Sequence, residues 1–157
     1  MAERIKDHMS MKITLCGSIT FIDEMVVLKN ELEKLGHEAH TPVLEFRNEN
    51  GKLISAKEFQ VLRKSDEKQD DWVWRRKKEA MLGHYDEIVW SDAILVLNEE
   101  KNGIPGYIGA NTLLEMGLAL YLRKPIYLWN PIPEISYKEE LLGMWPVVLD
   151  RDLKKIV

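Results

Sequence analysis

One apolar run constrains the fold of this chain more than any other segment. Residues 93–97 (AILVL) are apolar throughout, with Asp92 before them and Asn98 after them. A short run without polar alternation is typical of a strand that is buried on both faces, as in a parallel sheet covered by helices. We therefore expect an α/β fold in which this strand lies inside the sheet.

Further apolar runs alternate with helical segments on both sides of this strand. A small hairpin or loop is expected around the Asn-Gly of 45–55, and Gly83 is the expected break in the long helical stretch. This order predicts a three-layer sandwich, flavodoxin-like or Rossmann-like, with a mostly parallel sheet of about five strands and helices on both faces. The other predicted strands are residues 12–16, 37–43, 125–129 and 146–149, and the predicted helices are 21–35, 56–90, 111–122 and 137–144.

Length and composition fit one globular domain. The 157 residues suffice for a substantial core, and we expect a single α/β domain over residues 11–157. Residues 1–10 are charged and lack a signal-peptide pattern, which indicates a disordered segment or an expression remnant. No apolar run approaches the roughly 18 residues that cross a bilayer. The single cysteine, Cys16, suits a reducing compartment, so a cytoplasmic location is expected.

The charge balance argues against nucleic acid as a partner, because the formal net charge is −4. Trp72 and Trp74 do precede a basic run at 75–78, a combination that can bind bases and phosphates. An acidic stretch lies just upstream, however, and favours an amphipathic helix whose tryptophans pack inward or onto a partner chain. An intermediate interpretation is that Arg75 or Arg76 reaches a 5′-phosphate.

Two predicted loops converge on one crevice. Residues 17–20 and 98–111 follow the carboxyl ends of the first and third strands of the main alternation, where doubly wound sheets bind ligands. The second loop leads into a helix that carries Glu115, and a helix N-terminus is a ready anion site. A carboxylate there suggests chemistry on a nucleotide. The alternative is that Thr112-x-x-Glu115 is a capping box, in which the acid binds only its own helix end.

Three segments resemble the nucleoside 2-deoxyribosyltransferase superfamily, which includes deoxynucleoside 5′-monophosphate N-hydrolases. They are residues 13–19 (ITLCGSI), 91–98 (SDAILVLN) and 110–128 (ANTLLEMGLALYLRKPIYL). The resemblance covers most of residues 12–128 in the same order. The Glu-x-Gly-x-Ala pattern in the helix is its specific part.

The resemblance implies that Glu115 is a nucleophile on the anomeric carbon of a nucleoside or its 5′-monophosphate, leading to transfer or hydrolysis. A second family acid, on the helix before the central strand, falls on His84 or Asp86. The family's tyrosine in the first strand falls on Thr14. Gly117 would let the helix pack closely on its neighbour. No cofactor or metal is implied, and a neighbouring subunit that completes the site would make the protein a homodimer or higher oligomer.

The substrate would lie against both loops. Gly17 and Ser18 offer a backbone N–H and a hydroxyl to a phosphate or sugar, and Tyr107 could stack on a base. Asn111 and Thr112 are polar contacts or simple helix caps. The residues expected to bind substrate are Cys16, which also reads as a small core residue, Gly17, Ser18, Ile19, Tyr107, Gly109, Asn111 and Thr112.

Two rival functions remain open from the sequence. Residues 105–109 with Thr112-x-x-Glu115 faintly resemble the loop of a lysine-decarboxylase-like phosphoribohydrolase, with one insertion. A non-catalytic sensor could bind a nucleotide or an ADP-ribose-like ligand in the same crevice, and Thr14 and His84 favour it because they depart from the family pattern. Release of free base separates an enzyme from a sensor.

Overall fold

The computed structural model describes residues 9–65 and 71–157, so the segment predicted at 1–10 lies, apart from its last two residues, outside the described part. A five-stranded parallel sheet forms the centre, in the order β2-β1-β5-β6-β7. The sequence order of these strands matches the prediction. Their bounds are β1 (Lys12–Cys16), β2 (Glu38–His40), β5 (Ala93–Val96), β6 (Ile126–Leu128) and β7 (Val147–Val148).

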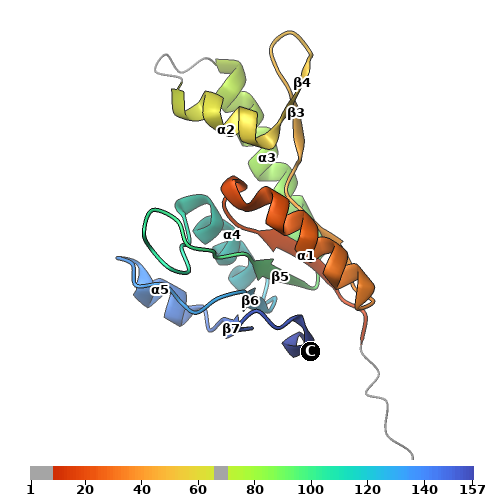
Figure 1. Ribbon diagram of the computed structural model, residues 1–157, viewed down its shortest axis with the longest axis vertical. Helices are drawn as coiled ribbons and strands as arrows, with labels where there is room; N and C mark the ends of the chain where they lie inside the picture. Colours follow the sequence, from red (N-terminus) through yellow and green to blue (C-terminus); the bar gives the residue numbers. More distant parts are fainter. Residues whose placement is uncertain (1–8, 66–70) are drawn as a thin grey trace, which may run out of the picture.

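Helices cover both faces of the sheet, which confirms the three-layer α/β prediction (Figure 1). One face is covered by α1 (Ile22–Lys34), which follows a 3₁₀ turn at Ile19–Phe21. The other is covered by α3 (Asp71–Trp90), α4 (Ala110–Tyr121) and α5 (Lys138–Gly143). A second 3₁₀ turn, Leu153–Lys155, comes near the C-terminus. In the ranges that the structure describes, no helix combines the length and the apolar character needed to cross a membrane.

The apolar run of β5 is buried on both sides, as its composition predicts. Leu95 and Leu97 belong to the core beneath α1, whereas Ile94 and Val96 belong to the core beneath α4. Successive side chains of a strand point to opposite faces, so a strand between two helical layers needs apolar residues at every position. This burial places the carboxyl end of β5 beside that of β1, with Cys16 opposite Val96.

A hairpin and a helix extend from the sheet between β2 and α3 (Figure 1). The predicted hairpin is confirmed as β3 (Glu45–Arg47) paired antiparallel with β4 (Leu53–Ser55), and α2 (Ala56–Ser65) follows it. The predicted break at Gly83 is wrong, because α3 runs through this residue. The change of helix falls between α2 and α3 instead.

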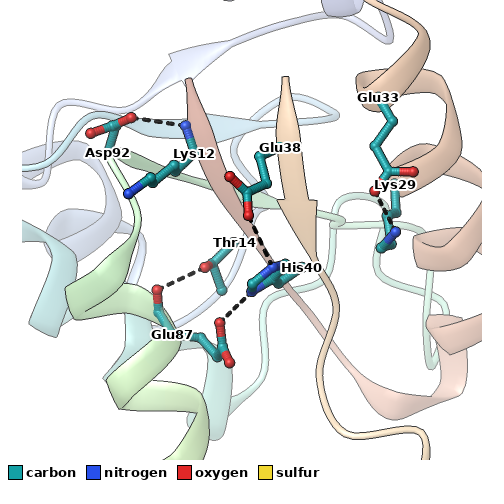
Figure 2. A network of polar contacts seen from close by, with 8 residues as sticks. All are labelled: Lys12, Thr14, Lys29, Glu33, Glu38, His40, Glu87 and Asp92. Carbon is teal, nitrogen blue, oxygen red and sulfur yellow. Dashed lines mark hydrogen bonds and ion pairs between the residues drawn. The ribbon is translucent and has the colours of Figure 1, made fainter. Parts of the chain in front are cut away.

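Polar contacts fix α3 against β1 and β2 (Figure 2). The Thr14 hydroxyl donates a hydrogen bond to the backbone carbonyl of Glu87 (2.9 Å), and the Glu87 carboxylate pairs with His40 Nδ1 (2.5 Å). The His40 ring also stacks on Trp90, with 4.0 Å between ring centroids. Because His84 lies about one turn before Glu87, these contacts hold its side chain near the carboxyl end of β1.

Candidate active site

A pocket of about 240 Å³ opens where β1 and β5 end. Its floor comes from the turn after β1 and the first turns of α4, and its walls come from α2, α3 and the loop after β5. This is the position in which the sequence predicts a ligand crevice. Parallel strands that end together leave their loops on one edge of the sheet, so the two predicted loops meet here.

Most of the predicted site residues line this pocket. Asp86 does not: its side chain is exposed on α3, outside the pocket lining. Cys16 is fully buried and lies behind the lining residues rather than among them. The predicted residues that line the pocket are Gly17, Ser18, Ile19, His84, Tyr107, Gly109, Asn111, Thr112 and Glu115.

The N-terminus of α4 faces the pocket without a capping box. Gly109 is the N-cap, no side chain caps the helix, and the first backbone bond runs from Leu113 N–H to the Gly109 carbonyl (2.9 Å). Glu115 therefore lies well beyond the N3 position that a capping box requires. The backbone N–H groups of residues 110–112 have no intrahelical acceptor and remain at the pocket, where they favour an anion.

The Glu115 carboxylate is nearly buried at the bottom of the pocket, with 4% of the residue exposed. Its Oε1 accepts a hydrogen bond from the Asn111 side-chain amide, one helical turn earlier (3.0 Å). Its Oε2 lies 3.8 Å from His84 Nε2. Within the described residues, Oε2 is the only buried side-chain oxygen or nitrogen without a hydrogen-bond partner. One carboxylate oxygen is thus held in place and the other is left for a ligand.

Burial sets the protonation of both groups. Loss of solvation raises the pKa of Glu115 to about 7, although the thiol of Cys16 and the positive charge of Lys77 act in the opposite direction. Burial likewise lowers the pKa of His84 to about 4, against the opposing effects of Glu87 and a hydrogen bond to the Leu15 backbone. At neutral pH the imidazole is therefore uncharged, and the contact between His84 and Glu115 is not an ion pair of two full charges.

Cys16 and Thr14 both lie on β1, but only the Cys16 side chain contacts His84 at this site. Both residues point to the same face of the sheet, because they are two positions apart. Thr14 is occupied by its hydrogen bond to the α3 backbone, whereas Cys16 Sγ lies 3.5 Å from His84 Nε2. Burial raises the pKa of the Cys16 thiol, and the Glu115 charge raises it further, so the thiol is protonated at neutral pH.

The pocket is also lined by three cationic side chains that the sequence analysis did not select as site residues. Arg63 comes from α2, Lys77 from α3 and Lys101 from the loop after β5. Burial lowers the pKa of Lys77, and the charge of Arg63 lowers it further, so these two cations lie close enough to repel each other. Such a pair favours an anionic ligand between them.

The two arginines considered from the sequence lie elsewhere. Arg75 is exposed, and Arg76 pairs with Glu79 (2.8 Å) and contacts the Arg47 carbonyl; neither lines the pocket. Trp72 packs beside Phe59, with 6.2 Å between ring centroids, as the amphipathic interpretation predicts, whereas Trp74 is exposed on α3. Of the basic run at 75–78, Lys77 is the residue that lines the pocket.

Buried Asn98 shapes the loop that carries Tyr107. Its side-chain amide donates to the carbonyls of Asn130 (2.9 Å) and Gly106 (3.4 Å). Gly106 has a φ of +71°, and a Cβ there would lie 2.5 Å from the Pro131 carbonyl oxygen, so only glycine fits. The loop presents Tyr107 to the pocket, beside Lys101, whose ammonium donates to the Ser18 hydroxyl (2.8 Å).

Comparison with known proteins gives likenesses of fold. No family model and no curated protein sequence matches this chain. A 2-deoxyribosyltransferase from Bacillus psychrosaccharolyticus is similar at 19% identity and a TM-score of 0.47, over 76% of this chain and 72% of that one. A CMP N-glycosidase from Clostridium botulinum is similar at 16% identity and a TM-score of 0.43, over 87% and 84%.

A third similar structure is a conserved protein from Enterococcus faecalis, with 14% identity and a TM-score of 0.44 over 87% of this chain and 75% of that one.

Proposed function

We propose that this protein is an enzyme that cleaves the N-glycosidic bond of a nucleoside 5′-monophosphate, with Glu115 as the nucleophile, and passes the sugar phosphate to water or to a second base. The observation that carries the proposal is the Glu115 carboxylate at the floor of the pocket. One of its oxygens is positioned by Asn111 and the other has no partner among the described side chains and backbone. An acid used only to cap its helix would be bonded to the helix end.

The chemistry follows from this placement. The ionised carboxylate attacks the anomeric carbon, and the bond to the base breaks with its electron pair going to the base nitrogen, which takes up a proton from solvent. The transition state has oxocarbenium character, which a nearby carboxylate stabilises before it forms the glycosyl-enzyme. Water then completes hydrolysis, or a second base completes transfer. His84 Nε2 faces the same carboxylate and is placed to contact a sugar hydroxyl.

The cations define where a 5′-phosphate would bind. Arg63, Lys77 and Lys101 line the pocket together with Ser18 and the N-terminus of α4, and all of these favour a phosphate. Tyr107 lies against Gly109, where a Cβ would come within 3.3 Å of its ring, and it offers the pocket an aromatic face for a base. The proposal thus places the phosphate at the cations and the anomeric carbon at Glu115.

The decisive experiment measures free base released from ribo- and deoxyribonucleosides and from their 5′-monophosphates by liquid chromatography. Glu115→Gln should reduce release by at least about 10²-fold, since it removes the nucleophile and keeps the shape. Glu139→Gln, the same change at an exposed position on α5, should leave release unchanged. Tight binding of a monophosphate by the wild-type protein with no release would instead support the non-catalytic sensor.

A second pair of variants tests the phosphate site. Lys77→Gln should raise KM for a monophosphate at least about tenfold, whereas Arg76→Gln, one residue away and outside the pocket, should not. Lys77 also lowers the pKa of Glu115, so the comparison is best made above pH 8, where the carboxylate is ionised in both variants. An equal KM change for the unphosphorylated nucleoside would refute a phosphate role for Lys77.

We further propose that the protein acts as a homodimer or higher oligomer. Two exposed apolar pairs support this proposal, because residues seven positions apart lie on the same face of a helix. They are Leu82 and Val89 on α3, and Leu114 and Tyr121 on α4, and each of these residues is more than half exposed. The Gly117 prediction needs a correction: among residues 9–65 and 71–157, nothing outside its own helix and its chain neighbours lies within 4 Å of the Cβ that Gly117 lacks, so it does not serve close packing inside this part of the subunit. Light scattering after size-exclusion chromatography gives the oligomeric state, and a monomer at every protein concentration tested would refute the oligomer.

A further inference from the structure

Three potential metal ligands meet at the floor of the pocket. Cys16 ends β1, His84 lies on α3 and Glu115 lies on α4, so the fold brings together residues that are distant in the sequence. Their ligand atoms all lie within 4.8 Å of one another. In the described residues, no other group of three or more cysteine, histidine and acidic side chains comes this close.

The distances suit a tetrahedral ion. With Zn–S of about 2.3 Å and Zn–N of about 2.0 Å, the two ligand atoms of a tetrahedral site lie roughly 3.6 Å apart. Cys16 Sγ and His84 Nε2 are 3.5 Å apart. His84 Nε2 and Glu115 Oε2 are 3.8 Å apart, against roughly 3.4 Å in such a site, and all three ligand atoms lie within 4.8 Å of one another, so the carboxylate must move toward the other two ligands to complete the site.

A second observation points to a ligand in this place. Glu115 is 4% exposed and its Oε2 faces His84 and Cys16 without a hydrogen-bond partner among the described residues. A buried polar atom left in this way is costly, and coordination would satisfy it. Oε1 stays bonded to Asn111, which orients the carboxylate much as supporting groups orient the ligands of zinc sites.

We propose that Cys16, His84 and Glu115 form a Zn²⁺ site at the floor of the pocket, with the fourth position open toward the pocket. The second part of the inference rests on the proposed function: Zn²⁺ held there occupies the Glu115 carboxylate and blocks its attack on the sugar. Zn²⁺ would therefore act as an inhibitor of this enzyme. A thiolate, an imidazole and one carboxylate form a zinc-type donor set rather than a magnesium or calcium one.

Zn²⁺ binding requires each of the three ligands in a defined protonation state. The imidazole binds in its uncharged form and releases nothing. The thiol loses its proton to solvent as the Zn–S bond forms, and the carboxylate binds ionised, losing a proton only in the fraction of molecules where it carried one. Two anionic ligands then compensate the charge of Zn²⁺, which offsets the cost of burying it. His84 and Glu115 line the pocket, so the ion enters from there.

Cobalt provides a direct test, because Cys16 is the single cysteine of the chain. Adding Co²⁺ to protein stripped with EDTA should produce a thiolate-to-cobalt charge-transfer band in the near ultraviolet and intense tetrahedral bands in the visible. The charge-transfer band can come only from Cys16. Cys16→Ser should abolish it, and Zn²⁺ should displace it in the wild-type protein. No charge-transfer band in the wild type would overturn the site.

Competition with a chromophoric chelator then measures Zn²⁺ affinity. Cys16→Ser, His84→Asn and Glu115→Gln should each weaken it at least about 100-fold, since each removes one of three protein ligands. Glu139→Gln is the matched control for Glu115→Gln, because Glu139 is exposed on α5, outside the pocket, and its loss should leave affinity unchanged. Circular dichroism confirms that each variant is folded. Equal affinity in the wild type and all ligand variants would mean adventitious binding and overturn the proposal.

Activity separates the two parts of the inference. The EDTA-treated enzyme should release base, and one equivalent of Zn²⁺ should stop the release. Full activity with the site filled would refute the blocking role, and so would activation by Zn²⁺. A protein that releases no base under any condition would refute the proposed function, while the cobalt and competition measurements would still decide whether the metal site exists.

Discussion

Removing Glu115 or His84 should expose two opposite dependences of stability on pH that hide each other in the wild-type protein. The pKa of Glu115 is raised from 4.5 to about 7 in the folded state, so folding disfavours the ionised form of this carboxyl group relative to the protonated form. Its contribution to stability is therefore lost as pH rises from 4.5 through 7. The pKa of His84 is lowered from 6.5 to about 4, so its contribution is lost as pH falls through that range.

The magnitudes follow from the shifts. One pKa unit corresponds to about 1.4 kcal/mol, so each group changes the free energy of unfolding by about 3 kcal/mol over its range. Because the ranges overlap and the signs differ, the two terms nearly cancel in the wild type. Neither group is among the causes of the other's shift, so each term should survive in the variant that lacks its partner.

The assay is urea unfolding of metal-free Glu115→Gln and His84→Asn between pH 4 and 8, followed by tryptophan fluorescence. Glu115→Gln keeps the titration of His84, so its free energy of unfolding should increase as pH rises toward neutral. His84→Asn keeps the titration of Glu115, so its free energy of unfolding should decrease over the same range. All other titrating groups are shared, so the difference between the two curves should change by roughly 6 kcal/mol across the range. Parallel curves would refute the reasoning.

Three further predictions concern the surroundings of the site. Asn111→Ala removes the amide that donates to Glu115, so the pKa of Glu115 should rise and the acid limb of kcat/KM for base release should move to higher pH; an unchanged profile would exclude this role. Gly106→Ala should destabilise by at least about 2 kcal/mol in urea unfolding, because its Cβ would meet the Pro131 carbonyl at a positive φ; a neutral effect would contradict the tight loop. Gly117→Ala should raise the free energy of unfolding in urea by up to about 1 kcal/mol, because alanine favours a helix over glycine and open space surrounds the added Cβ; a loss of stability would contradict this.

The sequence was sufficient for the Gly-Ser turn and Glu115 because local signals and topology agree there. Gly17 marks a turn directly after an apolar strand, and a Cβ at this position would lie 2.9 Å from the Leu97 carbonyl. Glu115 lies in a helix after the next central strand. Parallel strands must end on one edge of the sheet, so the meeting of these residues followed from strand order alone.

The cations were not predictable in the same way. Arg63 and Lys77 lie on helices whose sequence is charged on several faces, and a charged residue on such a helix reads as solvated. Their place at the pocket depends on how α2 and the β3–β4 hairpin pack over it. The same limit applied to the choice between His84 and Asp86, two residues apart, because the rotation of α3 decides which side chain faces inward.

By itself, the sequence determined the alternation of strands and helices, the parallel sheet and the edge at which its loops meet. These follow from the periodicity of apolar residues and from the steric rules for connections, both of which act locally along the chain. Only the tertiary structure decided that Glu115 is buried beside an uncharged His84 and a protonated Cys16, because burial and its effect on pKa depend on neighbours from β1, α3 and α4 at once.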